Sequence, residues 1–269
     1  MDTVNSPANS KPVQKINIRT MAREDLAQWL EQYNEPHFRA KQIFEWLWIK
    51  GADHFDMMTN LPQSLRAKLE ESFVFHIAEV DIVQKSQDGT IKVGFTLHDG
   101  RTVEGVIIPT SKRITACISS QVGCSLHCSF CATGHQGFSR NLSLGEMLGQ
   151  VWAINYLANV GRVTNVVLMG MGEPLLNYSN LKEFLKYLLL DEAYGLSRRK
   201  VTVSTSGIVP FIDRLRVDCP VSLAISLHAA NNELRNKLVP INRKYPLEQL
   251  MRACRDYQDS APRKFITFE

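Results

Sequence analysis

The stretch from residue 113 to residue 131 decides the expected fold. It reads Arg113-Ile-Thr-Ala-Cys-Ile-Ser-Ser-Gln-Val-Gly-Cys-Ser-Leu-His-Cys-Ser-Phe-Cys131. Its first part, Ile114 to Ser119, is an apolar run of strand length. Three cysteines follow within eight residues, on a loop after that strand. Because β/α barrels carry their active sites at the carboxyl ends of strands, the stretch predicts a strand that delivers a reactive loop.

The residues after this loop repeat a pattern of helix and strand. Ser143 and Glu146 have the spacing of a capping box and predict the start of a helix. Apolar strands are predicted at residues 163–169, 200–205, 221–226 and 263–269, with helices at 179–190, at 208–215 and after 231. Near-continuous apolar strands between helices indicate a parallel sheet buried on both faces. We expect an α/β fold, a β/α barrel or part of one.

The chain divides into four expected parts. Residues 1–15 are polar and predict a disordered tail. Residues 16–80 show helical periodicity and predict a small helical accessory domain. Residues 81–112 change to a period of two, with turns at 87–90 and 98–101, and predict a β-hairpin linker. Residues 113–269 form the partial barrel; because they end inside a predicted fifth strand, we expect the chain to lack a carboxyl-terminal part.

Composition sets broad limits on the class of protein. With 269 residues and 44% hydrophobic content, the chain can bury a sizeable core. Its net charge of +4 is mild for a nucleic-acid module and does not decide the partner. We expect a soluble cytoplasmic protein with no membrane partner, because no apolar run reaches the roughly 20 residues of a membrane helix and the first residues do not resemble a signal peptide.

The cysteine cluster has the spacing C-x3-C-x2-C, at Cys124, Cys128 and Cys131. Clustered cysteines in a cytosolic chain bind metal more often than they form disulfides. Four irons usually take four thiolates, so three thiolates leave one iron open to a substrate. The alternative is a zinc site completed by His127 or His135. We favour the iron–sulfur cluster, since zinc sites usually pair their ligands as two separated units.

Polar residues also follow later strands. In Gly170-Met-Gly-Glu-Pro174, glycines allow a ligand to approach the backbone and Glu173 can accept hydrogen bonds from an ammonium group. A dinucleotide-binding motif does not fit, because Leu175 stands where its third glycine belongs. Ser204, Ser226 and His228 end the next two strands. Each alone could be a turn, a cap or a half-buried residue, but their common position favours one shared site.

At this point the sequence resembles a known family. Cys-x3-Cys-x-Phe-Cys is similar to the signature of radical S-adenosylmethionine (SAM) enzymes. Longer runs at residues 117–124, 133–142, 165–177, 201–207 and 223–229 resemble the RlmN-type dual-specificity RNA methyltransferases, and the match extends from the helical domain to Glu269. The resemblance implies a [4Fe–4S] cluster, SAM, methylation of adenine carbon 2 in 23S rRNA and tRNA, a flavodoxin-type electron donor and a monomer.

The resemblance also implies residue roles. Cluster ligation falls to Cys124, Cys128 and Cys131, with Phe130 beside the adenine of SAM. The implied SAM contacts are Gly172, Glu173, Ser204, Ser226, Leu227 and His228. Cys117 matches the cysteine that resolves a covalent RNA adduct and Glu104 the acid/base carboxylate; without the resemblance, they would be a core thiol and an exposed strand residue. A disulfide bond is a further implied feature.

Chemistry explains why this reaction needs a radical. Carbon 2 of adenine lies between two ring nitrogens and has no lone pair to attack a sulfonium. In the family, one SAM methylates a carrier cysteine and a second SAM generates the radical. The carrier belongs to a carboxyl-terminal segment, and Cys219 and Cys254 are expected to be structural. We therefore expect this chain alone not to complete turnover.

Two other functions and the RNA contacts stay open. The first alternative is a related methyltransferase that acts on carbon 8 of the adenine, and the second is a zinc-stabilised RNA-binding protein without catalytic activity. Candidate phosphate contacts are Arg39, Lys41, residues 197–200 and residues 235–244. Each of these basic groups could equally be a solvated helix face.

Overall fold

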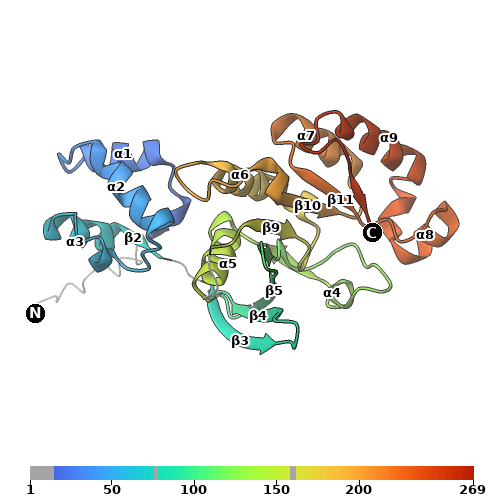
Figure 1. Cartoon of the computed structure of the whole chain (residues 1–269), viewed down its shortest axis with the longest axis horizontal. Helices are drawn as coiled ribbons and strands as arrows, with labels where there is room; N and C mark the ends of the chain where they lie inside the picture. The colour runs from blue at the N-terminus through green and yellow to red at the C-terminus, as the bar shows by residue number, and fades with distance from the viewer. Residues whose placement is uncertain (1–14, 76–77, 158–161) are drawn as a thin grey trace, which may run out of the picture.

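The computed structural model describes residues 15–75, 78–157 and 162–269. The tail expected over residues 1–15 therefore lies outside the described residues, except for Lys15. None of the helices in the described ranges is long and apolar enough to cross a membrane. The helices of residues 23–72 form one end of the molecule, and those that follow residue 208 form the other (Figure 1).

The amino-terminal part is helical, as its periodicity predicts. It contains α1 (Arg23–Glu31), α2 (Phe38–Phe44), a π-helical turn (Glu45–Ile49) and α3 (Gln63–Ser72), with the short parallel pair β1 (Ile16–Asn17) and β2 (Phe73–Val74). Arg19 attaches this part to α5 (Leu144–Leu157). Its buried guanidinium carbon lies 4.6 Å from the ring centroid of Trp152 and 5.0 Å from that of Phe75.

In the described part of the chain, the main sheet has eight strands in the order β12-β11-β10-β9-β6-β5-β4-β3. The strands are β3 (Glu79–Lys85), β4 (Ile91–Thr96), β5 (Thr102–Pro109), β6 (Ile114–Cys117), β9 (Asn165–Leu168), β10 (Val201–Thr205), β11 (Ser222–Ile225) and β12 (Thr267–Phe268). Pairs from β6 to β12 are parallel, which confirms the α/β prediction. Within the described residues, the barrel is not closed.

The predicted hairpin segment is part of the same sheet. β3, β4 and β5 pair antiparallel, and β5 then pairs antiparallel with β6, from Val106 opposite Cys117 to Pro109 opposite Ile114. The segment therefore extends the parallel sheet through continuous hydrogen bonding. Periodicity alone identifies such strands but not their pairing partners.

The two faces of the parallel strands differ in burial. Ala116, Val166 and Val203 alternate along their strands with Thr115, Val167 and Thr202, and the first three are fully buried, whereas the last three are half-buried. Both faces contain buried residues, since Cys117, Ser204 and Ala224 on the second face are also buried. Apolar side chains such as Val167 gave the strands their near-continuous pattern. The half-buried face is the interior of the open barrel.

The other α-helices described in this part of the chain are α4 (Ala132–His135), α6 (Tyr178–Leu189), α7 (Val209–Asp218), α8 (Asn232–Leu238) and α9 (Leu247–Gln258). The strand after α9 is shorter than the predicted residues 263–269, because Ala261 accepts a hydrogen bond from the backbone N–H of Lys264 at 3.1 Å and holds the chain in a turn. Lys264 has φ +58°, which also interrupts extended backbone.

The predicted capping box is confirmed at the start of α5. The hydroxyl of Ser143 accepts the Glu146 N–H at 3.3 Å, and Glu146 Oε2 accepts the Ser143 N–H at 2.8 Å. Arg140 donates to both carboxylate oxygens of Glu146, at 2.9 and 2.8 Å. Helix α5 therefore begins at a fixed point beside β8 (Phe138–Asn141).

We expect Ser143→Ala to lower the free energy of unfolding by about 1 kcal/mol, because one N–H at the helix start loses its acceptor. Urea denaturation followed by circular dichroism measures the change. Ser139→Ala, at an exposed position of β8, is the matched control and should leave stability unchanged. Equal stability of Ser143→Ala and the control would contradict the structural role of the cap.

Candidate functional site

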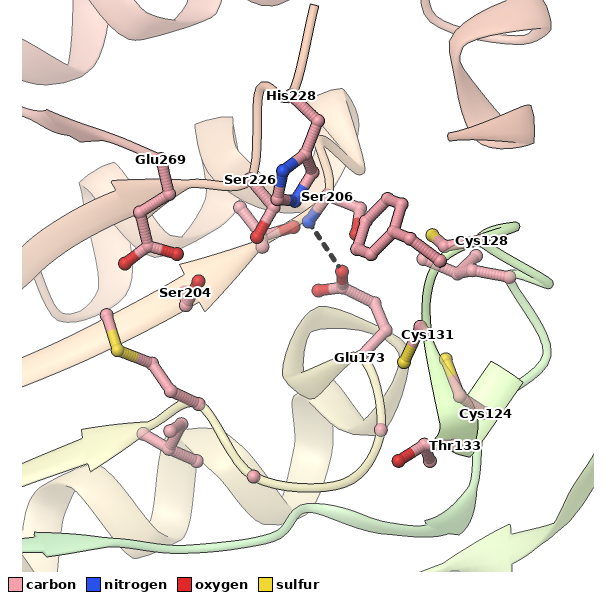
Figure 2. Close-up of a pocket in the computed structure, with 17 residues that line it drawn as sticks. Cys124, Cys128, Cys131, Thr133, Glu173, Ser204, Ser206, Ser226, His228 and Glu269 are labelled. Atoms are coloured by element: carbon pink, nitrogen blue, oxygen red, sulfur yellow. Dashed lines mark hydrogen bonds between the residues drawn. The ribbon is translucent and has the colours of Figure 1, made fainter. Parts of the chain in front are cut away.

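A pocket lies at the carboxyl ends of β9, β10 and β11, where the sequence predicts the site. Its lining includes Cys124, Cys128, Phe130, Cys131, Thr133, Leu168, Met169, Gly170, Gly172, Glu173, Ser204, Thr205, Ser206, Ser226, His228 and Glu269. In the view of Figure 2, the three cysteines lie on one side, Glu269 and Ser204 lie on the other, and Glu173 lies between them. The pocket thus brings most of the predicted residues together.

A small hairpin holds the cysteine loop. β7 (Gln121–Gly123) pairs antiparallel with β8, and the Cys124 N–H donates to the Gly137 carbonyl at 3.0 Å. Gly123 has φ +76°, and a Cβ there would lie 1.8 Å from that same carbonyl oxygen, so only glycine fits. At the far side, the Ser129 N–H donates to the Leu238 carbonyl at 3.1 Å. The loop is therefore fixed at both its base and its tip.

The donor set of the pocket fits an iron–sulfur cluster. Burial raises the pKa of Cys124 to about 11, and the neighbouring Cys128 and Cys131 add to this effect, so the three thiols lie within electrostatic range of one another. No three His, Cys, Asp or Glu side chains in the described ranges are grouped to hold a single metal ion. A four-iron cluster takes each thiolate on a different iron and does not need such convergence.

The zinc alternative finds no support in the two histidines. His127 Nδ1 lies 3.2 Å from the Gly134 carbonyl, and His135 Nε2 lies 3.2 Å from the Ser129 carbonyl. Neither ring lines the pocket that the cysteines share. A tetrahedral zinc ion would require a fourth ligand close to all three sulfurs.

Glu173 is a buried carboxylate with no cation among its recorded partners. Only 2% of its surface is exposed. Oε2 accepts the Ser206 N–H at 2.8 Å, and Oε1 accepts the Leu175 N–H at 3.1 Å. Desolvation raises the pKa of Glu173 to about 7, although these hydrogen bonds act in the opposite direction. Each oxygen keeps acceptor capacity, so the carboxylate suits the ammonium group of a ligand such as SAM.

The other predicted SAM contacts divide into two groups. Ser204, Ser226 and His228 line the pocket, and the His228 ring centroid lies 4.3 Å from that of Phe130. Leu227 does not line it. The Leu227 backbone is used within the protein, since its N–H donates to the Glu269 carbonyl at 2.9 Å and its carbonyl accepts from Arg235 at 3.0 Å.

Four polar residues of the pocket are not among the predicted site residues. Thr133, Thr205, Ser206 and Glu269 all line the cavity. Thr205 and Ser206 lie directly beside Ser204 in the polar run that ends this strand, but only Ser204 is predicted to contact SAM. No comparable signal in the sequence marks Thr133 or Glu269. Thr133 reaches the pocket through the hairpin around the cysteines, and Glu269 reaches it through the pairing of β12 with β11.

Glu104 and Cys117 lie outside the pocket lining but on the barrel-interior face. Val106 of β5 pairs with Cys117 of β6, and Cys117 pairs with Val167 of β9. Val167 in turn pairs with Thr202 of β10, which lies two positions before Ser204. Alternate residues of a strand share a face, so Glu104, Cys117 and Ser204 all belong to one surface of the sheet.

The two side chains have different surroundings. The side chain of Glu104 is 52% exposed and forms an ion pair with Lys92 at 2.6 Å. The Cys117 thiol is buried, and burial raises its pKa to about 11. A base is therefore required before this thiol can act as a nucleophile.

All six cysteines lie in the described part of the chain, and all are free thiols. The disulfide bond that the resemblance implied is thus absent from this structure. Cys219 ends α7 and Cys254 is buried on α9. Neither lines the pocket of the cysteine loop.

Comparison with known proteins agrees with the fold and with the residues of the pocket. Residues 118–268 match the radical SAM superfamily, and the chain belongs to it. Members of this superfamily use a [4Fe–4S] cluster and SAM. Residues 16–75 match the ribosomal RNA large subunit methyltransferase N-terminal domain.

A solved structure extends this assignment. The crystal structure of a radical SAM methyltransferase from Sphaerobacter thermophilus is similar to this chain, with a TM-score of 0.88 and 42% sequence identity. The similarity covers 94% of this chain and 75% of that one. The protein is therefore an enzyme of the radical SAM methyltransferase family.

The loop before Glu173 yields a test of the site's packing. A Cβ on Gly172, which has φ +99°, would lie 2.5 Å from Gln121 Cβ. We expect Gly172→Ala to lower the free energy of unfolding by on the order of 1–3 kcal/mol more than Gly100→Ala. Gly100 has φ +75° but nothing within 4 Å, so it reports backbone strain alone. Equal losses in urea denaturation would show that the loop is not tightly packed.

Proposed function

We propose that the protein methylates carbon 2 of adenine in 23S rRNA and tRNA. The observation that carries the proposal is one pocket lined by the three thiols of the C-x3-C-x2-C loop and by a buried carboxylate without a recorded cationic partner. The match of residues 16–75 to a ribosomal RNA methyltransferase domain supports RNA as the substrate class. Cluster and SAM together supply a carbon-centred radical, the chemistry that carbon 2 requires.

In this proposal, Cys124, Cys128 and Cys131 hold the cluster and Glu173 holds the SAM ammonium. Gly172, Ser204, Ser226 and His228 form the rest of the SAM site, with Phe130 and His228 offering ring surfaces to the adenine. Leu227 contributes to the SAM site only through its position at the end of β11. Its backbone N–H and carbonyl already form hydrogen bonds within the protein.

Cys117 resolves the covalent RNA adduct and Glu104 exchanges the proton, in the roles that the resemblance implies. Their shared face with Ser204 supports this assignment, because a base entering the open barrel would meet all three. The exposure of Glu104 leaves its carboxylate accessible to a substrate. We further propose that a flavodoxin-type protein supplies the electron and that the enzyme acts as a monomer.

RNA phosphates meet exposed basic side chains in this proposal. Lys41 on α2 and Arg198 to Lys200 before β10 are exposed. Arg39 is half-buried and pairs with Glu35 at 3.8 Å, so it is a weaker candidate. Arg235, one of the basic residues predicted to contact RNA, is fully buried and does not reach solvent.

Anaerobic reconstitution tests the proposed function. The protein should bind about four irons per chain and, with dithionite and SAM, release 5′-deoxyadenosine. Cys128→Ala should lose both properties, whereas Cys254→Ala, a buried thiol outside the pocket, should keep them. Stoichiometric zinc without cluster absorbance would overturn the proposal.

The position of methylation is tested with 23S rRNA fragments and tRNA, using the protein in its full natural length. Nucleoside mass spectrometry of the digested RNA should detect 2-methyladenosine. Detection of 8-methyladenosine would keep the radical chemistry but overturn the proposed base position.

The raised pKa of Glu173 predicts the pH dependence of SAM binding. Below its pKa of about 7, Glu173 is protonated, and an ammonium must displace this proton to bind. We expect SAM affinity to fall about tenfold per pH unit as the pH drops below 7. Glu173→Gln should weaken binding by on the order of 1–3 kcal/mol and remove this dependence. Calorimetry of the wild type that shows constant affinity below pH 7 would refute the assignment.

A further inference from the structure

Arg235 on α8 is buried directly behind the pocket, with 0% of its surface exposed. It braces the ends of two parallel strands. Nη2 donates to the Ser206 carbonyl at 2.7 Å and to the Ser226 carbonyl at 3.2 Å, and Nε donates to the Leu227 carbonyl at 3.0 Å. Nη1 donates to Asn242 Oδ1 at 2.7 Å. Each of these four acceptors is a neutral group.

Burying a cation among neutral acceptors costs free energy of desolvation. Carbonyl dipoles replace only part of the hydration that the guanidinium loses. The pKa of Arg235 is accordingly lowered by burial, and the groups that act against this effect are the thiols of Cys128 and Cys254. No carboxylate from the described ranges has a comparable influence on it. The arrangement therefore places a positive charge, without an ion-pair partner in the described part of the chain, at the strand ends that line the pocket.

Cys128 connects this charge to the pocket. Ser206 and Cys128 both line the pocket, and the Ser206 carbonyl accepts a hydrogen bond from Arg235 at 2.7 Å. Burial, Cys131 and Glu173 raise the pKa of Cys128, and Arg235 is the cation that acts in the opposite direction. Cys254, by contrast, does not line the pocket. The Ser129 N–H of the cysteine loop also donates to the carbonyl of Leu238, the last residue of α8, so the helix that carries Arg235 contacts this loop directly.

We propose that Arg235 is a positioning residue that tunes the cluster: it fixes the strand ends at Ser206 and Ser226, and its positive charge makes the cluster easier to reduce. The inference rests on the proposed function, because it requires a cluster on Cys128. When dithionite supplies one electron, the cluster gains one negative charge. A nearby cation stabilises this reduced form more than the oxidised form, so it raises the midpoint potential.

The test is a redox titration of the anaerobically reconstituted full chain, followed by electron paramagnetic resonance. Arg235→Gln removes the charge and should shift the midpoint potential to more negative values. Arg235→Lys keeps the charge and should lie closer to the wild type. Arg243→Gln removes an exposed charge from the neighbouring segment and should leave the potential unchanged.

A second variant separates the effect of the Arg235 charge from that of its hydrogen bonds to the strand ends. It can be used even where Arg235→Gln does not fold. Asn242→Asp keeps the Arg235 side chain and places a carboxylate on the acceptor that its Nη1 already contacts. The new ion pair offsets the charge, so the potential should again become more negative. Asn242→Leu is the neutral control, because it loses the same two hydrogen bonds that the Asn242 amide donates to Asn232 and Asn236. A purely structural role of Arg235 would give Asn242→Asp and Asn242→Leu the same potential.

The outcomes are distinguishable. A wild-type chain that takes up no cluster would overturn the proposed function and this inference together. A loaded cluster with one midpoint potential in the wild type and in every foldable variant would overturn this inference alone. A negative shift in Asn242→Asp relative to Asn242→Leu, with Arg243→Gln unchanged, would support it.

Discussion

Parallel pairing of β6, β9, β10 and β11 is the constraint on which the pocket depends. Because parallel strands run in one direction, their carboxyl ends meet at one edge of the sheet. The register brings Leu168 beside Val203 and Thr205 beside Ile225, so the loops after these strands emerge together. Residues far apart in the sequence, such as Cys124 and Ser226, thereby share one cavity.

Ser206 joins the parts of this edge. Its N–H donates to Glu173 from the β9 loop (Figure 2), its carbonyl accepts from Arg235 on α8, and it lines the pocket together with Cys128 of the cysteine loop. These two hydrogen bonds fix the backbone of Ser206, so a displacement of Glu173 or Arg235 changes the geometry of the other. The carboxylate and the guanidinium are therefore coupled through Ser206.

The sequence predicted those features whose causes are local. Alternating strands and helices, the Ser143 capping box and the cysteine loop follow from periodicity or spacing, and Glu173 follows a strand within a glycine-containing turn. Arg235 shows the limit of such reasoning. Its neighbours are polar and basic, which is typical of a solvated helix, but its burial depends on the carbonyls of β10 and β11 that the fold brings to it. Glu269 likewise reaches the pocket only through the pairing of β12 with β11.

The separation of Glu173 from Arg235 gives the pocket its chemical character. Both are buried and both bond to the backbone of Ser206, but the ion pairs recorded among the described residues do not join them. A direct pair would cancel the two charges and leave the pocket neutral. Glu173 and Arg235 lie on opposite sides of Ser206. The carboxylate therefore stays available to a cationic ligand, and the guanidinium stays available to the thiolate of Cys128. Hydrogen bonds offset part of the energetic cost of burying these two groups, and a bound cationic ligand and cluster would offset more of it, which ties the stability of this edge to the proposed function.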